Sequence, residues 1–196
     1  MTSTYSQLKR DLELGFEEGE KVVQCFLEEE MGVLVKNVGG SGIGWDLEFV
    51  GLDPQIIKSV KRKKDLIKLE KKFVSKFGRT FEVKRDKTSD RTNNLYWECW
   101  SNCRVETPGC MLDCKADSLV FVRKSEFIFL DRPVFLSWIF ENLFLRTKLS
   151  DKWRSKTFKR GKERMMSAGN NSDVRGILLP VEDVKQSPAC IHTKLR

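Results

Sequence analysis

Short segments with the composition of β-strands, separated by segments with helical spacing, most constrain how this chain can fold. β-branched and aromatic residues are frequent in the short segments, and we predict strands at residues 33–38, 45–50, 80–84, 95–100, 118–122, 126–130 and 177–184. Apolar residues recur every three or four positions at residues 12–31 and 133–145, which predicts helices. This order predicts an α/β domain with a mixed central sheet flanked by helices.

Glycine and proline mark the ends of the predicted helices. Gly32 follows the helix at 12–31, at the position where a glycine commonly ends a helix. Pro133 opens the helix at 133–145, and Asp131 can cap it. A shorter helix is predicted at residues 111–116.

A basic segment at residues 51–79 separates two of the predicted strands. Pro54 can open a helical insertion there and Gly78 can close it. Its cationic residues greatly outnumber its acids, and they are Lys58, Lys61, Arg62, Lys63, Lys64, Lys68, Lys71, Lys72, Lys76 and Arg79. Two interpretations are open, a solvated helix face and an arm that faces phosphates.

The overall charge favours nucleic acid as a partner. The chain of 196 residues has a net charge of +8 and a pI near 9.2, and a basic surplus of this kind suits phosphate binding, although it also suits simple solubility. We find no apolar run of the roughly 18 residues that a membrane span needs, and no signal-peptide core at the N-terminus. We therefore expect a cytoplasmic or nuclear protein without a membrane partner, whose cysteines are reduced.

One group of residues has the composition of a metal-dependent catalytic site. Phe81 and Val83 alternate with Glu82 and Lys84, so the two charged side chains share one strand face. Asp46 begins the preceding strand, after a glycine-rich turn at 39–42. Two carboxylates and the Val83 carbonyl are oxygen ligands of the kind that Mg²⁺ prefers. Lys84 would position or deprotonate the attacking water.

The same residues resemble a known family, the PD-(D/E)XK nucleases. The resemblance is carried by Asp46, by the triplet Glu82-Val83-Lys84, and by a following strand at 94–98. Residues 109–117 are similar to the connection that phage-type and resolvase-type members place before their next strand.

The resemblance implies a restriction-endonuclease-like fold of order α-β-β-β-α-β. Residues 1–145 would form the nuclease domain, with the basic insertion at 51–79, and residues 146–196 would be a basic, partly disordered extension. The chain departs from the family pattern in two ways. Trp45 replaces the proline of the motif name, and the insertion is longer than the minimal core allows.

The resemblance also implies an activity, a Mg²⁺-dependent deoxyribonuclease in which Mn²⁺ can substitute. Glu98 on the later strand and Glu20 on the first helix match positions that family members use near the metal, in addition to Asp46, Glu82 and Val83. DNA is the expected substrate rather than RNA. A homodimer would allow cleavage of both strands, and endonuclease, exonuclease and junction-resolving activities all remain open.

Three basic residues are candidates for contacts with the substrate. Lys87 and Arg91 follow the triplet, and Lys115 lies in the stretch that resembles the family connection. The glycine turn at 39–42 could line the same groove, because backbone N–H groups in such turns favour anions.

Four cysteines form an alternative candidate site, one that would bind zinc. Cys99, Cys103, Cys110 and Cys114 could hold a structural Zn²⁺, and the protein would then be a non-catalytic nucleic-acid-binding accessory protein. Core packing is the ordinary role of such residues. Cys25, Cys190 and His192 are expected to be bystanders, the last two in a disordered segment at 186–196.

Overall fold

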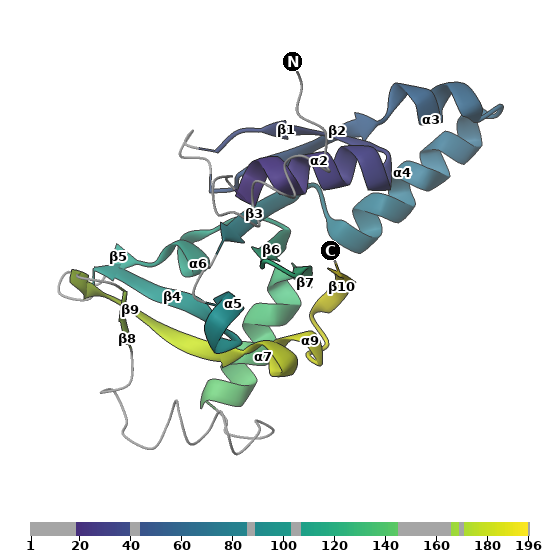
Figure 1. Cartoon of the computed structure of the whole chain (residues 1–196). Coiled ribbons are helices and arrows are strands. Elements are labelled where there is room, and N and C mark those ends of the chain that lie inside the picture. Colours follow the sequence, from purple (N-terminus) through teal and green to yellow (C-terminus); the bar gives the residue numbers. More distant parts are fainter. Residues whose placement is uncertain are drawn as a thin grey trace.

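The chain folds into two sheets with helices around them (Figure 1), in a computed structural model that describes residues 19–39, 44–85, 89–102, 107–144, 166–168 and 171–195. The helices are α2 (Gly19–Met31), α3 (Pro54–Ser59), α4 (Lys63–Phe77), α5 (Ser89–Thr92), α6 (Cys110–Asp113), α7 (Arg132–Phe144) and α9 (Val181–Lys185). The strands are β1 (Val33–Asn37), β2 (Leu47–Leu52), β3 (Thr80–Arg85), β4 (Asn94–Asn102), β5 (Thr107–Pro108), β6 (Ser118–Val122), β7 (Glu126–Asp131), β8 (Met166–Ala168), β9 (Asn171–Pro180) and β10 (Cys190–Leu195). Residues 12–18, Lys87, Cys103 and the basic stretch at 146–164 lie outside the described residues.

The main sheet has six strands in the order β1-β2-β3-β6-β7-β10. β1, β2 and β3 form an antiparallel meander, β6 runs parallel to β3, and β7 and β10 continue the sheet antiparallel. The prediction of an α/β domain with a mixed sheet flanked by helices is confirmed. The strand at 95–100 differs from the expectation, since β4 does not belong to this sheet and pairs with β9 and β5 in a second sheet of four strands.

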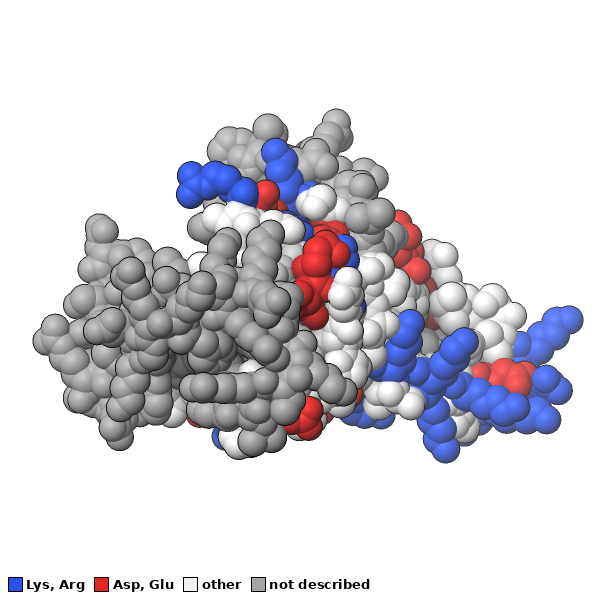
Figure 2. All heavy atoms as spheres, turned by 90° about the horizontal axis from the view of Figure 1, so that it is seen from below, with Lys and Arg blue, Asp and Glu red and all other residues white. Residues whose placement is uncertain are grey.

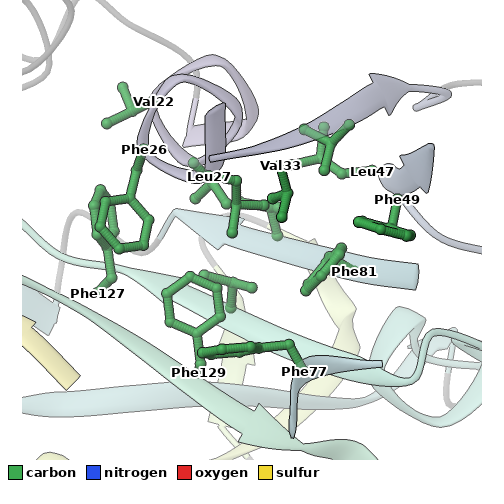
Figure 3. Packing of buried hydrophobic residues seen from close by; sticks show 14 of the residues in the cluster. Val22, Phe26, Leu27, Val33, Leu47, Phe49, Phe77, Phe81, Phe127 and Phe129 are labelled. Carbon is green, nitrogen blue, oxygen red and sulfur yellow. The ribbon is translucent and has the colours of Figure 1, made fainter. Parts of the chain in front are cut away.

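One face of the main sheet is covered by α2 and α4. Phenylalanines dominate this core, where the ring of Phe26 of α2 lies tilted against those of Phe127 and Phe129 of β7, and Phe77 of α4 packs edge-on against Phe129 (Figure 3). Phe81 and Val83 of β3 point into the same cluster. Their burial confirms the predicted orientation of β3, whose odd-numbered positions face the helices.

The opposite face of the main sheet packs against the second sheet and α7. Leu119 and Phe121 of β6 meet Trp97 of β4, Phe135 of α7 and Leu179 of β9 in a second buried cluster. Strand β6 is buried at every position, because its alternate residues enter the two different cores. β6 therefore lies between two packed layers, and β3 pairs with it along one edge.

The basic insertion is two helices rather than one. Asp53 caps α3 by accepting a hydrogen bond from the Gln55 N–H, and Pro54 occupies the first turn as predicted. The chain is extended at Val60 and Arg62, so α4 starts afresh at Lys63. Gly78 ends α4 with φ 75°. Together α3 and α4 project from one end of the molecule, far from the second sheet (Figure 1).

The C-terminal segment belongs to both sheets. β9 extends the predicted strand at 177–184 toward the N-terminus and ends at Pro180, where the short helix α9 begins. β10 pairs with β7 along the edge of the main sheet, so the expectation of disorder at 186–196 is wrong for residues 190–195. His192, expected to be a bystander, lies against the rings of Phe26, Phe77 and Phe129. Phenylalanines far earlier in the chain thus provide the burial that the local sequence lacks.

Among the described residues, the structure contains no helix that is both long enough and apolar enough to cross a membrane.

Candidate active site

Asp46 sits at the point where β2 separates from β3, and its backbone is held on both sides. The Asp46 N–H donates to the Phe81 carbonyl at 2.9 Å, and the Asp46 carbonyl accepts from the Val38 and Gly39 N–H groups. Its Oδ2 accepts from the Val83 N–H at 2.8 Å. The Asp46 carboxylate therefore accepts a hydrogen bond from a backbone N–H of β3 at a position where β2 no longer pairs with β3.

This contact places Asp46 beside the predicted triplet. The N–H and C=O of one strand residue point to the same side of the strand, so the Val83 carbonyl is directed to the edge where Asp46 lies. Two of the predicted oxygen ligands, the Asp46 carboxylate and the Val83 carbonyl, thus share one edge of β3.

Glu82 and Lys84 lie on the other face of β3 from Phe81 and Val83, as predicted. Lys84 Nζ is 2.6 Å from Glu82 Oε1, and Glu82 is only 7% exposed. Burial raises the pKa of the Glu82 carboxyl, while Lys84 opposes that rise and the charges of Asp46 and Glu20 add to it. The site therefore places the charges of two further acidic groups near one buried carboxylate.

Glu20 lies in the first turn of α2. Its neighbour Gly19 lies so close to β3 and β6 that a β-carbon there would be 3.2 Å from Arg85 Cβ and 3.4 Å from Val83 Cγ1. The start of α2 is thereby packed onto the strand that carries the triplet. The influence of Glu20 on the Glu82 pKa agrees with this placement.

Residues from the connection before β6 line the same region. The Lys115 N–H donates to the Gly44 carbonyl at 3.0 Å, which ties this connection to the turn that precedes Asp46. Lys115 itself is exposed and lies just beyond α6, which ends at Asp113 rather than at the predicted residue 116. Cys114 is buried, and burial raises the pKa of its thiol, as does the nearby charge of Glu82.

Two other predicted residues lie on other elements. Glu98 lies on β4 in the second sheet, on the face opposite Leu95 and Trp97, whose side chains pack toward the main sheet. Arg91 is an exposed residue of the short helix α5. Lys87 lies outside the described residues.

The cysteine cluster is described only in part. Cys114 Sγ accepts a hydrogen bond from the Ala116 N–H at 3.4 Å and packs in the second core cluster. The side chains of Cys99 and Cys110, and all of Cys103, lie outside the described part of the chain. A zinc site at these four residues therefore stays a prediction.

The donor set fits a hard divalent cation. Within the described residues no group of three or more His, Cys, Asp and Glu side chains is arranged to hold a metal ion. Mg²⁺ does not need such a group, because it is commonly bound by one or two carboxylates together with water and substrate phosphate. Asp46 and Glu82 would supply the two carboxylates of such a site, and the Val83 carbonyl would add a neutral oxygen.

Asp117 is a positioning residue that the sequence did not reveal. Its Oδ2 accepts from the Arg79 and Thr80 N–H groups at 2.7 and 3.1 Å, and its own N–H donates to Thr80 Oγ1 at 2.8 Å. These reciprocal bonds join the start of β3 to the start of β6. Gly78 is required beside them, because a β-carbon there would be 2.2 Å from Asp117 Cβ. An aspartate before a strand gives no sequence signal for this role.

Comparison of the chain with protein-family models, with curated proteins and with solved structures finds no match. The chemistry of the site residues is therefore what supports a function.

Proposed function

We propose that this protein is a Mg²⁺-dependent nuclease of the PD-(D/E)XK type that hydrolyses phosphodiester bonds in DNA. The observation that carries the proposal is the hydrogen bond from the Val83 N–H to Asp46 Oδ2, because it sets a second carboxylate beside the Glu82-Lys84 pair. Carboxylates with a lysine on one strand form the residue set that metal-assisted phosphodiester hydrolysis requires.

Each residue has a distinct role in this proposal. Asp46 and Glu82 would hold the ion, with the Val83 carbonyl as a further ligand and Glu20 as an outer carboxylate. When bound, Mg²⁺ supplies Lewis-acid chemistry, which polarises the phosphate and lowers the pKa of coordinated water. Asp46 stays fixed by its bond to β3 and therefore needs little reorganisation to bind.

Lys84 would orient the attacking water and stabilise negative charge that develops on the phosphate. Its ammonium group, held 2.6 Å from Glu82 Oε1, stays next to the carboxylate that binds the ion. Hydrogen-bond donors fixed in this way contribute most when charge develops in the transition state. Lys115, beside the turn that precedes Asp46, is suited to contact substrate phosphates.

Cleavage of plasmid and branched DNA with Mg²⁺, with Mn²⁺ and with chelator tests the proposal. We expect cleavage with either metal and none with chelator. Lys84→Ala should abolish cleavage but still bind DNA, and Asp46→Ala should also be inactive. If the wild type is as inert as Asp46→Ala on linear, nicked, single-stranded and four-way-junction DNA, the protein is not a nuclease. A non-catalytic nucleic-acid-binding role would then be the better hypothesis.

A further inference from the structure

The outward face of α4 carries a row of lysines that the proposed catalytic site does not use. Phe73 and Phe77 define the buried face of this helix. At 100° per residue, Lys64, Lys68, Lys71 and Lys72 fall within an arc of about 100° on the opposite face. All four are exposed. Blue atoms accordingly gather at the end of the molecule that α3 and α4 form (Figure 2).

The acids of α4 do not neutralise this row. Asp65 pairs with Arg62 at 2.7 Å, and Glu70 pairs with Arg79 at 3.3 Å. Lys76 is also engaged, since its ammonium lies 4.9 Å from the centre of the Phe77 ring. No ion pair joins Lys64, Lys68, Lys71 or Lys72 to an acid within the described part of the chain. Their charges are therefore available to an external anion.

The spacing of the lysines suits a polyphosphate chain. Lys64, Lys68 and Lys72 are four residues apart, which places successive ammonium groups about 6 Å apart along the helix axis. Phosphates of one DNA strand are about 3.4 Å apart along the duplex axis, so each step of the row matches about two phosphates.

The exposed residues of the two helices favour a duplex over a single strand. Proteins that bind single strands usually combine a basic groove with aromatic rings on which bases stack. Both rings of α4, Phe73 and Phe77, are buried, and the large apolar side chains exposed on α3 and α4 are the aliphatic Ile57, Ile67 and Leu69. The described surface of α3 and α4 thus offers charges that can bind a phosphate backbone, but no exposed aromatic ring on which a base could stack.

The row also runs away from the catalytic strand. α4 ends at Phe77, and only two residues separate it from the start of β3 at Thr80. Lys72 is therefore nearer to β3 along the chain, and Lys64 lies about 12 Å farther out along the helix axis. The row lies on the side of α4 away from the sheet, and Glu82 lies on the sheet face that α4 does not cover, so the row is separate from the catalytic site.

We propose that the outward face of α4, formed by Lys64, Lys68, Lys71 and Lys72, binds the phosphate backbone of a nucleic-acid duplex outside the catalytic site. This assignment rests on the proposed function only in taking the bound polymer to be the nucleic acid that the nuclease would cleave. Binding itself needs neither metal nor cleavage, so the two ideas can fail separately.

Fluorescence anisotropy with a labelled 30-base-pair DNA duplex, in chelator and over 50–200 mM salt, tests the assignment. A variant with all four lysines changed to Gln should lose most of its affinity at low salt. Each phosphate contact contributes about 0.9 to the slope of log K against log salt, so the slope should fall by about 3 to 4. Over this salt range, the wild type should lose about 100-fold more affinity than the variant.

Matched variants make the outcome decisive. Changing the same four lysines to Arg preserves the charge and should preserve the affinity, and the pairs Lys64/Lys68 and Lys71/Lys72 changed to Gln should each remove about half of the slope. Circular dichroism and thermal unfolding check that each variant is folded.

Several results would overturn the assignment. These are equal salt slopes for the wild type and the fourfold Gln variant, equal or tighter binding of a single strand of the same length, and lysine-dependent binding only to vesicles rich in phosphatidylserine. A parallel titration with an RNA duplex identifies which nucleic acid the face binds. If the wild type binds the duplex in chelator through these lysines but never cleaves DNA, the assignment of the α4 face is supported and the nuclease proposal fails.

Discussion

Two buried glutamates of the main sheet have opposite surroundings. Glu126 on β7 is 4% exposed, and its two oxygens meet two cations, Arg123 Nη1 at 2.5 Å and Lys185 Nζ at 3.1 Å. Glu82 on β3 is 7% exposed and, among the described residues, pairs with the single cation of Lys84, while Asp46 and Glu20 add negative charge around it.

The surroundings of Glu126 extend into a network. Arg123 also donates to the Ser89 carbonyl at 3.0 Å and to Asn93 Oδ1 at 2.9 Å, which fastens α5 to the turn between β6 and β7. The pairing raises the pKa of Lys185, whose partner carboxylate favours its charged form. The charges of this cluster pair with one another, and its hydrogen bonds join separate elements of the fold.

The comparison indicates what is unusual about Glu82. A buried carboxylate ordinarily gains enough partners to offset its desolvation. Burial raises the pKa of Glu82 even though Lys84 lies beside it, so its ionised form is incompletely compensated. A bound cation would supply the missing compensation, and such an imbalance is more typical of functional sites than of structural ones.

Removing the lysine from each cluster should separate catalysis from stability. We expect Lys84→Ala to lower the rate of Mg²⁺-dependent cleavage by about 10³-fold, because it removes a donor fixed at the reacting group. Binding of a DNA duplex in chelator should stay within about twofold of the wild type. Lys185→Ala is the matched control, and its cleavage rate should equal that of the wild type. Equal loss of cleavage in both variants would show that the effect of Lys84 is not specific.

Breaking the Glu126 cluster should cost the most stability. Arg123→Met leaves the Glu126 carboxylate partly uncompensated and removes the bonds to Ser89 and Asn93, so the free energy of unfolding should fall by about 3 kcal/mol. Urea unfolding measures this change. Arg62→Met, which removes a pair whose arginine is exposed, should change stability by less than about 0.5 kcal/mol. A small effect of Arg123→Met would contradict the structural role of this cluster.

Magnesium should stabilise the protein through Glu82. A ligand that binds only the folded state at ten times its Kd adds about 1.4 kcal/mol to the free energy of unfolding. We therefore expect Mg²⁺ to raise the Tm of the wild type and to have no effect on Glu82→Gln. Glu182→Gln alters an exposed carboxylate of α9 and should keep the full shift. A Mg²⁺ shift that persists in Glu82→Gln would place the ion elsewhere.

The raised pKa of Glu82 gives the smallest effect, with a definite sign. A carboxyl whose pKa is higher in the folded state contributes stability below its unfolded pKa, and this contribution is lost as pH rises through the folded value. Glu82→Gln should therefore match the wild type in acid and become more stable than it toward neutral pH, by up to about 1 kcal/mol. Urea unfolding at pH 4 and pH 8 measures the difference. An advantage that shrinks as pH rises would mean that Lys84 outweighs burial.

Local sequence patterns predicted the strands around the site better than they predicted which strands pair with one another. The alternation of Phe81 and Val83 with Glu82 and Lys84 was enough to orient β3, because only one orientation buries both apolar side chains. The alternation of Leu95 and Trp97 with their more polar neighbours likewise identified β4 as a strand. It did not identify the sheet, since β4 pairs with β9, roughly 80 residues later, and no local pattern encodes that pairing.

Other differences have the same origin. Helical spacing continues across Val60, so the sequence predicts one helix where the backbone is extended and two helices form. Residues 190–195 form a short strand that is stabilised by backbone pairing with β7 and by contact between His192 and distant phenylalanines. The role of Asp117 likewise depends on a backbone 37 residues earlier.

The place of β10 has a consequence for the order of folding during synthesis. This strand completes the edge of the main sheet, and His192 packs on Phe26 from the first described helix. Contacts of such large sequence separation slow folding, because a long loop must close before they form. While the ribosome is still translating the preceding residues, Phe26, Phe77 and Phe129 lack this cover. We therefore expect a nascent chain that stops before residue 190 to bind chaperones and to resist proteases poorly.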